Sequence, residues 1–509
     1  MGLSKSRFVS GLQCYKQLWW RVHEPEAPEL TAGAEQQAIF DQGHLVGAKA
    51  REHFPGGVLV DAHHGDFDGR IAQTQAALAT EAPAIFEAAF SADDVFVAVD
   101  VLERTARGWT LVEVKSSTKV KEQYIPDAAI QLHVLRRAGL HVDRVEIMHL
   151  NRDCRFPDLG NLFVRADVTD EVESALPHLE GASTALLHML EGPLPDVATG
   201  DHCKTPYPCP FLERCWPVAP LHQVSTPHRN SFIAERQRRA VEENRLIVET
   251  SLRDALDAVT YPCAVLDFET VQSAIPVWGG CRPYDQVPVQ FSCHVVTGSN
   301  DVTSPNAAAG RNTVTHHEWL ADPFQDPRPE MATRVVEACR GATVVVAYNA
   351  SFERTILGQL AEAVPEHAVA LADIAARLVD ALSLVRDHVY HPDFGGRFSL
   401  KSVLPALVPG MGYDGLEIAS GGLAALKLRR LMFDADVSLA ERERTRAALL
   451  QYCAVDTLGV VRLLDRLRAA SQSEPRDGAG RRVFDRVVAW LTSLWRQGAR
   501  TARRSRGPD

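Results

Sequence analysis

The chain lacks any uninterrupted apolar run long enough to cross a bilayer, and its first residues, M-G-L-S-K-S-R-F, lack the apolar core of a signal peptide. It also lacks an excess of positive charge, because 54 Lys and Arg residues stand against 65 Asp and Glu residues, giving a formal net charge of −11. These absences predict a cytoplasmic protein without a membrane partner. The charge balance also argues against binding of nucleic acid over the whole surface, as in a strongly basic protein. Any nucleic-acid contact should therefore be local.

The length of 509 residues, 46% of them hydrophobic, suffices for two or three domains with full cores. We expect an α/β chain in four parts: a first domain over 1–225, a helical linker over 226–260, a second domain over 261–470, and a C-terminal helix with an arginine-rich tail over 471–509. The first domain should end in a loop rich in Pro and Cys. In the linker, an apolar stripe predicts one amphipathic helix over Phe232–Val259.

Acidic residues at two distant places in the second domain predict a metal site. Asp267 and Glu269 end the strand-like run A-V-L-D-F-E-T, and a strand places residues two apart on one face. Tyr452 and Asp456, in Y-C-A-V-D, are four apart on a helical stretch and also share a face. Carboxylates gathered in this way suit Mg²⁺ or Mn²⁺, and two such ions can promote phosphodiester cleavage.

Further candidates lie between these two motifs. The strand-like run T-V-V-V-A-Y delivers Asn349 and Glu353 in N-A-S-F-E, and R-L-V-D supplies Asp380. Either Glu353 or Asp380 could complete the set of carboxylates. Arg397 and Lys401, in F-G-G-R-F-S-L-K, are candidate phosphate contacts, and Asn349 is a further candidate for substrate binding.

In order and spacing, these motifs resemble the DEDD superfamily of 3′–5′ exonucleases, in particular its tyrosine-bearing branch, over residues 262–467. The resemblance implies a ribonuclease-H-like fold in which Asp267, Glu269 and Asp456 hold two ions and Tyr452 orients the attacking water. The family has Asp where this chain has Glu353, so the longer side chain is a departure. Acids at strand ends are often helix caps or surface residues, but that alternative suits a single motif better than three in order.

A second group of chemically matched residues lies in the first domain. The strand-like V-F-V-A-V-D ends at Asp100, and W-T-L-V-E-V-K places Glu113 and Lys115 on one face of the next strand. F-D-Q-G-H supplies His44 upstream, and A-A-I-Q-L-H supplies Gln131 downstream. Two carboxylates can hold Mg²⁺, and a lysine beside them can stabilise an attacking hydroxide or the charge of the phosphate.

The order of these motifs resembles the RecB-type branch of the PD-(D/E)xK nucleases, which implies a restriction-endonuclease-like fold. In that branch the histidine adds a metal ligand, and the glutamine helps to position substrate or metal. E-x-K alone is common on exposed strands, so the interpretation depends on the whole order of motifs.

Four of the ten cysteines are candidates for binding a metal or a cluster. Cys203, Cys209 and Cys215 are separated by five residues each in a loop with several prolines, and Cys14 lies far upstream in G-L-Q-C-Y. A disulfide framework is not expected in a reducing cytosol, whereas four thiolates could hold zinc or an iron-sulfur cluster. The arrangement resembles the 4Fe-4S staple of RecB-family nucleases, including the CRISPR-associated ones. That resemblance implies a cluster that ties the ends of the domain together, with zinc as the alternative.

Together these resemblances indicate a bacterial domain-of-unknown-function family that fuses a RecB-like nuclease carrying an iron-sulfur cluster to a DEDD exonuclease. They imply a metal-dependent enzyme that degrades or trims DNA, most readily from single-stranded ends and with 3′–5′ polarity at the second site, in repair, recombination or phage defence. Two alternatives stay open. One is an RNA-processing 3′–5′ exonuclease, and the other is a nucleic-acid-binding scaffold in which one nuclease site is vestigial.

Overall fold

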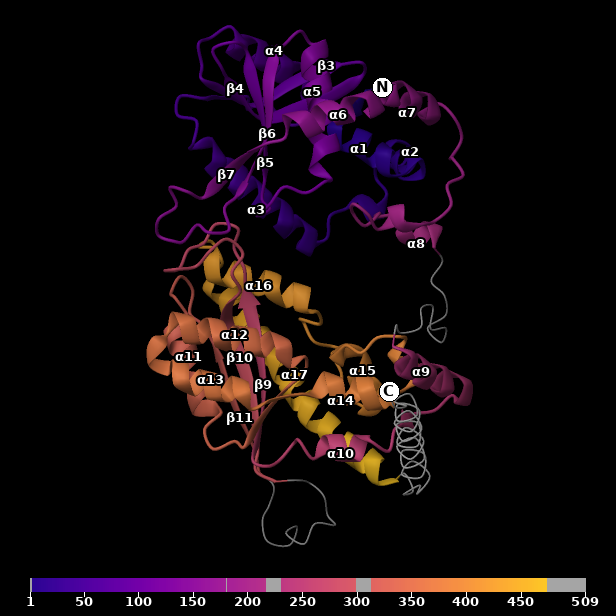
Figure 1. Ribbon diagram of the computed structural model, residues 1–509, viewed down its shortest axis with the longest axis vertical. Helices are drawn as coiled ribbons and strands as arrows, with labels where there is room; N and C mark the ends of the chain where they lie inside the picture. The colour runs from indigo at the N-terminus through magenta and orange to yellow at the C-terminus, as the bar shows by residue number, and fades with distance from the viewer. Residues whose placement is uncertain (1, 180, 217–229, 299–312, 474–509) are drawn as a thin grey trace, which may run out of the picture.

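The computed structural model describes residues 2–179, 181–216, 230–298 and 313–473 (Figure 1). Within them the protein is a mixed α/β chain with two mixed sheets and a long C-terminal helix, which confirms the predicted α/β class. The predicted helix and arginine-rich tail after the second domain lie outside the described residues.

The first domain is built on a seven-stranded mixed sheet with the order β2-β3-β4-β5-β6-β7, in which β1 pairs with the start of β4. Its strands are β1 (Leu3–Ser4), β2 (Val58–Leu59), β3 (Ala84–Ala92), β4 (Val95–Arg104), β5 (Trp109–Lys115), β6 (Val142–Leu150) and β7 (Phe163–Asp167). Strand β4 runs antiparallel to β3 and β5, whereas β5 and β6 are parallel.

Helices cover both faces of this sheet, which explains why its central strands are nearly continuous apolar runs. The helices are α1 (Lys5–Gln13), α2 (Tyr15–His23), α3 (Ala34–Arg51), α4 (Phe67–Leu78), α5 (Tyr124–Arg137), α6 (Thr169–Leu179), α7 (Ala182–Leu190) and α8 (Leu212–Cys215). Helix α5 packs on the face of β5 that carries Leu111. Helix α3 packs through Val46 and Ala50 on the opposite face, which carries Val112 and Val114.

The second domain contains a five-stranded sheet with the order β11-β10-β9-β12-β13. Its strands are β9 (Cys263–Val271), β10 (Val287–Val296), β11 (Val314–Leu320), β12 (Val344–Ala347) and β13 (Leu378–Asp380). Strand β10 is antiparallel to β9 and β11, whereas β12 runs parallel to β9 and β13. One face packs on α11 (Arg328–Ala338), α12 (Ala350–Ala363) and α13 (Ala368–Ala376), and the other packs on α17 (Leu439–Ser473) (Figure 1).

Helix α17 is long and apolar enough to cross a membrane by length and composition alone. More than half of its most apolar window is buried in the protein, where it packs on β9 and β10. It is therefore the core helix of this domain. The same face also holds α14 (Ala381–His388), α15 (Leu400–Leu407) and α16 (Gly421–Phe433).

The segment between the two sheets is not the single helix predicted to continue to Val259. Helix α9 (Ser231–Glu243) ends because Asn244 takes the left-handed conformation, with φ of 45°, that commonly terminates helices. The chain continues as β8 (Ile247–Val248), which pairs with β14 (Val389–Tyr390), and then as α10 (Leu252–Leu256). These elements pack on the second domain, so the segment is part of that domain.

The two domains meet through α3 and the segment that follows β9. The side-chain amide oxygen of Gln42 accepts a hydrogen bond from the backbone N–H of Ala274 at 3.0 Å. The hydroxyl of Tyr284 donates to the carbonyl of Ser116 at 2.6 Å. A small apolar cluster that includes Val46 and Ala274 lies beside these bonds. The segments that directly follow β5 and β9 therefore take part in the contact between the domains.

Candidate active sites

Strand β9 and helix α17 bring three carboxylates together in the second domain. Asp267 and Glu269 lie two apart on β9, on the face that α17 covers, and Asp456 projects from α17. One oxygen from each lies within 4.8 Å of the other two. Among the described residues, no other set of three His, Cys, Asp or Glu side chains is gathered this closely. Asp267 and Glu269 therefore share one face of β9, as the alternation of strand side chains predicted.

Burial and mutual repulsion disfavour the charged forms of these acids. Burial raises the pKa of Asp267, and the nearby Asp456 raises it further. Burial, Asp267 and Asp456 likewise raise the pKa of Glu269. Burial raises the pKa of Asp456 too, although hydrogen bonding and Lys401 oppose the shift. A divalent cation would relieve both effects, and an oxygen-only donor set suits Mg²⁺ or Mn²⁺, so these residues fit the metal that the resemblance implies.

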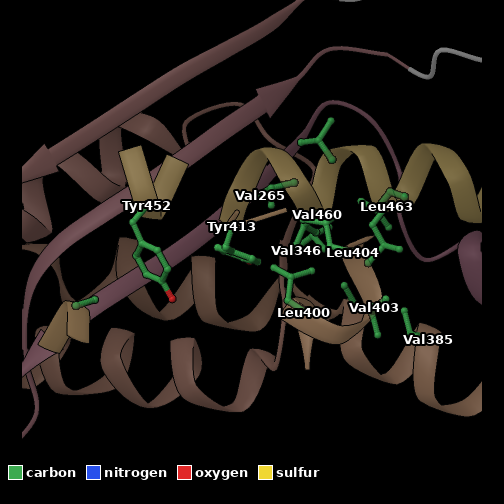
Figure 2. Close-up of a cluster of buried hydrophobic side chains, with 14 of the residues drawn as sticks. Val265, Val346, Val385, Leu400, Val403, Leu404, Tyr413, Tyr452, Val460 and Leu463 are labelled. Atoms are coloured by element: carbon green, nitrogen blue, oxygen red, sulfur yellow. The ribbon is translucent and has the colours of Figure 1, made fainter. Parts of the chain in front are cut away.

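A cavity of about 280 Å³ opens over the three acids. Tyr452 lines it as predicted, and so does Tyr413, which the sequence analysis missed. The Tyr413 hydroxyl donates a hydrogen bond to Oδ1 of Asp456. Figure 2 shows both tyrosines beside the apolar side chains of α15 and α17, including Leu400 and Val460. Tyr413 lies in the connection between α15 and α16, where no periodic pattern marks it as a site residue.

Lys401 also lines this cavity. Its Nζ lies 5.0 Å from the ring centroids of Tyr413 and Tyr452 and donates to the carbonyl of Ala419 at 2.8 Å. Burial lowers the pKa of Lys401, whereas Asp456 and the neighbouring Glu269 oppose that shift. Lys401 is thus the positive group beside the acids.

Two other predicted substrate contacts lie away from the cavity. Arg397 is exposed and does not line it. Asn349 precedes α12 in the left-handed conformation, with φ of 76°, and its side-chain oxygen accepts a hydrogen bond from Ser351. The structure therefore brings only Lys401 of the three candidates to the acids.

Glu353 and Asp380 are the two candidates for the fourth metal-binding acid, and their surroundings differ. Asp380 caps α14, and it accepts hydrogen bonds from the backbone N–H groups of Asn349, Ala350 and Leu382 and from the hydroxyl of Ser383. A carboxylate with this many donors is held as a structural cap.

Glu353 is 1% exposed, and its Oε2 has no hydrogen-bond partner in the described part of the chain. Burial raises its pKa to about 9, with a further contribution from Asp267. Glu353 is therefore a buried acid that lies close enough to Asp267 for their charges to interact and has one oxygen free of hydrogen bonds in the described part of the chain.

In the first domain, β4, β5 and α5 assemble the other predicted group. Both oxygens of the buried Glu113 are engaged: Oε1 accepts from Lys115 at 2.7 Å, and Oε2 accepts from Gln131 at 2.7 Å. Asp100, on the neighbouring strand, accepts a hydrogen bond from the backbone N–H of Val114 at 2.7 Å. Asp100, Glu113, Lys115 and Gln131 thus lie together, as the order of motifs predicted.

Two charged residues that the sequence analysis missed complete this group. Lys5 of α1 lies 3.0 Å from Glu113 and 3.4 Å from Asp127, and Lys115 lies 2.6 Å from Asp127. Asp127 precedes Gln131 by one helical turn on α5, so the i, i+4 rule could have found it. Lys5 had no comparable signal, because only the tertiary fold brings α1 against the sheet.

The two lysines set the electrostatics of the first site. Burial alone would raise the pKa of Glu113, but the ammonium groups of Lys115 and Lys5 lower it. Burial and the charge of Glu113 raise the pKa of Asp100 to about 7. Two carboxylates close enough for their charges to interact fit a divalent ion at Asp100 and Glu113.

The structure does not bring His44 to this group. Strand β5 presents Glu113 toward α5, whereas His44 lies on α3, which covers the opposite face of the sheet. On α3 the side chain is exposed and lies about 200° around the helix from the buried Val46. The role of His44 as a metal ligand stays a prediction, because a sequence motif does not reveal which face of a sheet its helix covers.

The four predicted cysteines line one small cavity, together with the packed ring of Trp20. Cys14 ends α1, and the backbone N–H of Cys209 donates to the carbonyl of Cys203 at 2.9 Å. Burial raises the pKa of the Cys209 thiol, and the other three thiols contribute to the shift.

The spacing of these sulfurs bears on the choice of cofactor. No three of them lie within 4.8 Å of one another, whereas tetrahedral zinc would hold its sulfurs about 3.8 Å apart. The four thiols thus share one cavity without the close spacing of sulfurs around a bound zinc ion.

A family model described as a domain of unknown function (DUF2779) matches residues 264–399. The match begins in β9 and includes Asp267, Glu269 and Glu353, but it stops before Tyr452 and Asp456. No curated protein matched the chain.

Proposed function

We propose that this protein is a metal-dependent nuclease with two active sites, which degrades or trims DNA from single-stranded ends. The convergence of Asp267, Glu269 and Asp456 within 4.8 Å, beside Tyr452 and Lys401, carries this proposal. Asp267 and Glu269 project from β9, the first strand of the mixed sheet along the chain, and Asp456 projects from α17, which packs on that sheet. This arrangement supports the ribonuclease-H-like assignment. The second site acts from a 3′ end, as in the tyrosine-bearing branch that its motifs resemble.

At the second site, Asp267, Glu269 and Asp456 would hold the ions, with Glu353 as the fourth acid. Bound divalent ions supply positive charge that lowers the pKa of a water molecule and stabilises the leaving oxygen. The Tyr413 hydroxyl fixes the carboxylate of Asp456, and Tyr452 borders the same cavity, where its hydroxyl can orient the attacking water.

At the first site, Asp100 and Glu113 would hold a metal ion, and Gln131 fixes the orientation of Glu113. Lys115 and Lys5 place two positive charges beside these acids, where they can stabilise negative charge on a phosphate. This arrangement supports the PD-(D/E)xK assignment without the histidine of the RecB-type pattern.

The four cysteines would hold an iron-sulfur cluster that clasps the N-terminal helices to the end of the first domain. Cys14 lies at the end of α1 and Lys5 at its beginning. The cluster would therefore also fix a helix that reaches the first site. Anaerobic purification should give brown protein that contains iron and acid-labile sulfide. Colourless protein with stoichiometric zinc would overturn the cluster assignment.

The decisive experiment is metal-dependent digestion of end-labelled and circular single-stranded DNA by wild type, Asp100→Asn, Asp267→Asn and the double variant. We expect Asp267→Asn to abolish stepwise shortening from the 3′ end, Asp100→Asn to abolish the remaining cleavage, and the double variant to be inactive. Asp436→Asn, at an exposed position, is the control. Undiminished cleavage by the double variant would refute the proposal.

The same digestion distinguishes the alternatives. Cleavage of a matched RNA strand in preference to DNA would identify an RNA-processing exonuclease. If one single variant behaved as wild type and the other abolished all activity, the site altered in the unaffected variant would be vestigial. The protein would then have one working active site.

A further inference from the structure

The buried carboxylate of Glu113 is occupied by three hydrogen-bond donors. Its Oε1 accepts from the ammonium groups of Lys115 at 2.7 Å and Lys5 at 3.0 Å. Its Oε2 accepts from the side-chain amide of Gln131 at 2.7 Å. A carboxylate offers about four lone-pair positions, two on each oxygen, so the two ammonium groups fill Oε1. An ion that binds Glu113 through this oxygen therefore competes with both lysines.

Asp127 contacts the same two ammonium groups. Its Oδ2 accepts a hydrogen bond from Lys115 at 2.6 Å, and its Oδ1 lies 3.4 Å from the Nζ atom of Lys5. Charge-assisted bonds between an ammonium nitrogen and a carboxylate oxygen are about 2.8 Å long, so a shift of roughly 0.6 Å would give Lys5 a full bond to Asp127. Both lysines thus have a second acceptor close to their present positions.

Helix α5 holds Asp127 in this position. Asp127 lies in the first turn of the helix, one turn before Gln131, whose amide also donates to the backbone carbonyl of Asp127 at 3.1 Å. Tyr124 begins the same helix, and its ring centroid lies 5.1 Å from the Nζ atom of Lys115. Helix α1, which begins with Lys5, packs against α5. The first turn of α5 and the first residue of α1 therefore meet in the first active site.

The two acids and the two lysines form a balanced set of charges. Glu113 is 2% exposed and Asp127 16%, whereas Lys115 and Lys5 are 20% and 24% exposed. Burial and the charge of Glu113 raise the pKa of Asp127, and the two lysines oppose that shift. Because both acids accept from the lysines, an ammonium group can change partners without leaving a buried charge unpaired.

A simpler role for Asp127 is to interact with the dipole of α5, as an acid in the first turn of a helix does. Asp170, in the first turn of α6, has that position on an exposed surface. Asp127 differs from it because its side chain is largely buried and contacts two ammonium groups of the first site. These contacts give Asp127 a role in the site beyond the end of its helix.

We propose that Asp127 is a positioning residue that takes over Lys5 and Lys115 from Glu113 when the first site binds its metal ion. The inference rests on the proposed nuclease function. With both lysines on Asp127, Oε1 of Glu113 is free to bind the ion, and the ammonium groups stay in the site, where they can contact a phosphate. The lysines remain protonated throughout, so the exchange moves no proton.

A double-mutant cycle on metal binding tests this exchange. Asp127→Asn, Lys5→Met and the double variant are made in the full chain carrying Asp267→Asn, and binding is measured from the electron paramagnetic resonance signal of free Mn²⁺. Asp127→Asn should weaken Mn²⁺ binding at the first site about tenfold, the effect of one charge-assisted hydrogen bond, because the lysines then stay on Glu113.

The informative quantity is the effect of Lys5→Met in the two proteins. Removal of a positive charge favours a cation in either protein through Coulomb attraction alone. The exchange requires a larger effect where the lysine has lost its second acceptor. We therefore expect Lys5→Met to strengthen binding at least about threefold more in the Asp127→Asn protein than in its parent, beyond the roughly twofold within which independent substitutions add.

Asp170→Asn is the matched control, because it makes the same substitution in the first turn of a helix of the same domain. It should bind Mn²⁺ as its parent does. Recovery of affinity on adding Lys5→Met also excludes a folding defect in the Asp127→Asn protein. Equal effects of Lys5→Met in both proteins would overturn the inference, as would unchanged affinity in Asp127→Asn. Mn²⁺ binding that persists after Asp100→Asn would overturn it too, because the ion would then lie elsewhere.

Failure of this inference is distinguishable from failure of the proposed function. If protein with both sites intact cuts neither DNA nor RNA in the presence of Mg²⁺ or Mn²⁺, the nuclease proposal fails whatever the cycle shows. If the protein cuts DNA, Asp100→Asn abolishes cleavage by the first site, and the effects of Asp127→Asn and Lys5→Met simply add, only the exchange of lysines fails.

Discussion

Replacing Glu353 by Gln removes a carboxylate that burial disfavours in the metal-free protein. Its side chain is 1% exposed, and burial together with Asp267 raises its pKa from an ordinary 4.5 to about 9. The folded state therefore retains a proton that the unfolded state releases above pH 4.5. The resulting loss of stability is absent below that pH and grows as the pH rises toward the folded pKa.

At pH 7 this cost amounts to about 3 kcal/mol, because each unit between the unfolded pKa and the ambient pH contributes about 1.4 kcal/mol. Glu353→Gln avoids the cost with nearly the same shape. We therefore expect the variant to raise the free energy of unfolding at pH 7 by up to about 3 kcal/mol when metal is absent, and to change it little at pH 4.5. It should also remove most of the stabilisation by Mn²⁺ and the 3′–5′ activity.

Asp380→Ala is the matched comparison, because the two acids were equal candidates in the sequence. It removes the cap of α14 and the acceptor for two N–H groups at the start of α12. The expected cost is about 2 kcal/mol. Stabilisation by Mn²⁺ should persist, because four hydrogen-bond donors at the starts of α12 and α14 occupy the carboxylate of Asp380.

Urea unfolding with EDTA or Mn²⁺, at both pH values, measures these effects in an Asp100→Asn background that leaves only the second site able to bind metal. The reasoning fails if Glu353→Gln destabilises the metal-free protein at pH 7. It also fails if Glu353→Gln keeps full stabilisation by Mn²⁺ while Asp380→Ala loses it. The latter result would make Asp380 the fourth metal ligand.

Three further predictions concern the groups around the acids. Tyr413→Phe removes the hydroxyl that fixes Asp456, and it should weaken Mn²⁺ binding at the second site about tenfold, measured by titration in the Asp100→Asn background; unchanged affinity would contradict it. Lys5→Met should lower the cleavage rate of the first site in an Asp267→Asn background without changing the second site, and equal losses at both sites would indicate a folding defect. Because burial raises the pKa values of the second-site acids and metal binding requires carboxylates, the rise in melting temperature caused by Mn²⁺ should grow from pH 5 to pH 8, and a constant rise would refute the assignment.

The sequence predicted those parts of the sites that follow from local periodicity. Asp267 and Glu269 share a face because strand side chains alternate, and the same rule places Glu113 beside Lys115. The structure brings both pairs to the helices that supply their partners. The mixed α/β class followed from the same alternation of apolar strands and helices.

What the sequence could not predict depends on contacts between distant segments. Tyr413 reaches Asp456 from an irregular connection, and Lys5 reaches Glu113 from a helix more than a hundred residues away. The motif of His44 likewise does not specify which face of the sheet α3 covers. The linker helix was overextended because its apolar stripe continues past Asn244, whose left-handed conformation ends α9.

The two sites hold their acids by different physical means, and this difference bears on how a chain with net charge −11 can bind DNA. In the first site, Lys5 and Lys115 contact Glu113 and Asp127, so most of the negative charge is balanced within the fold. In the second site, Lys401 is the one positive group among the described residues that line the cavity, and burial raises the pKa values of the acids. The metal-free acids of the second site therefore hold protons that a bound cation must displace, whereas the charges of the first site are balanced by lysines. Metal concentration and pH would therefore together determine when the second site can bind the phosphates of a strand.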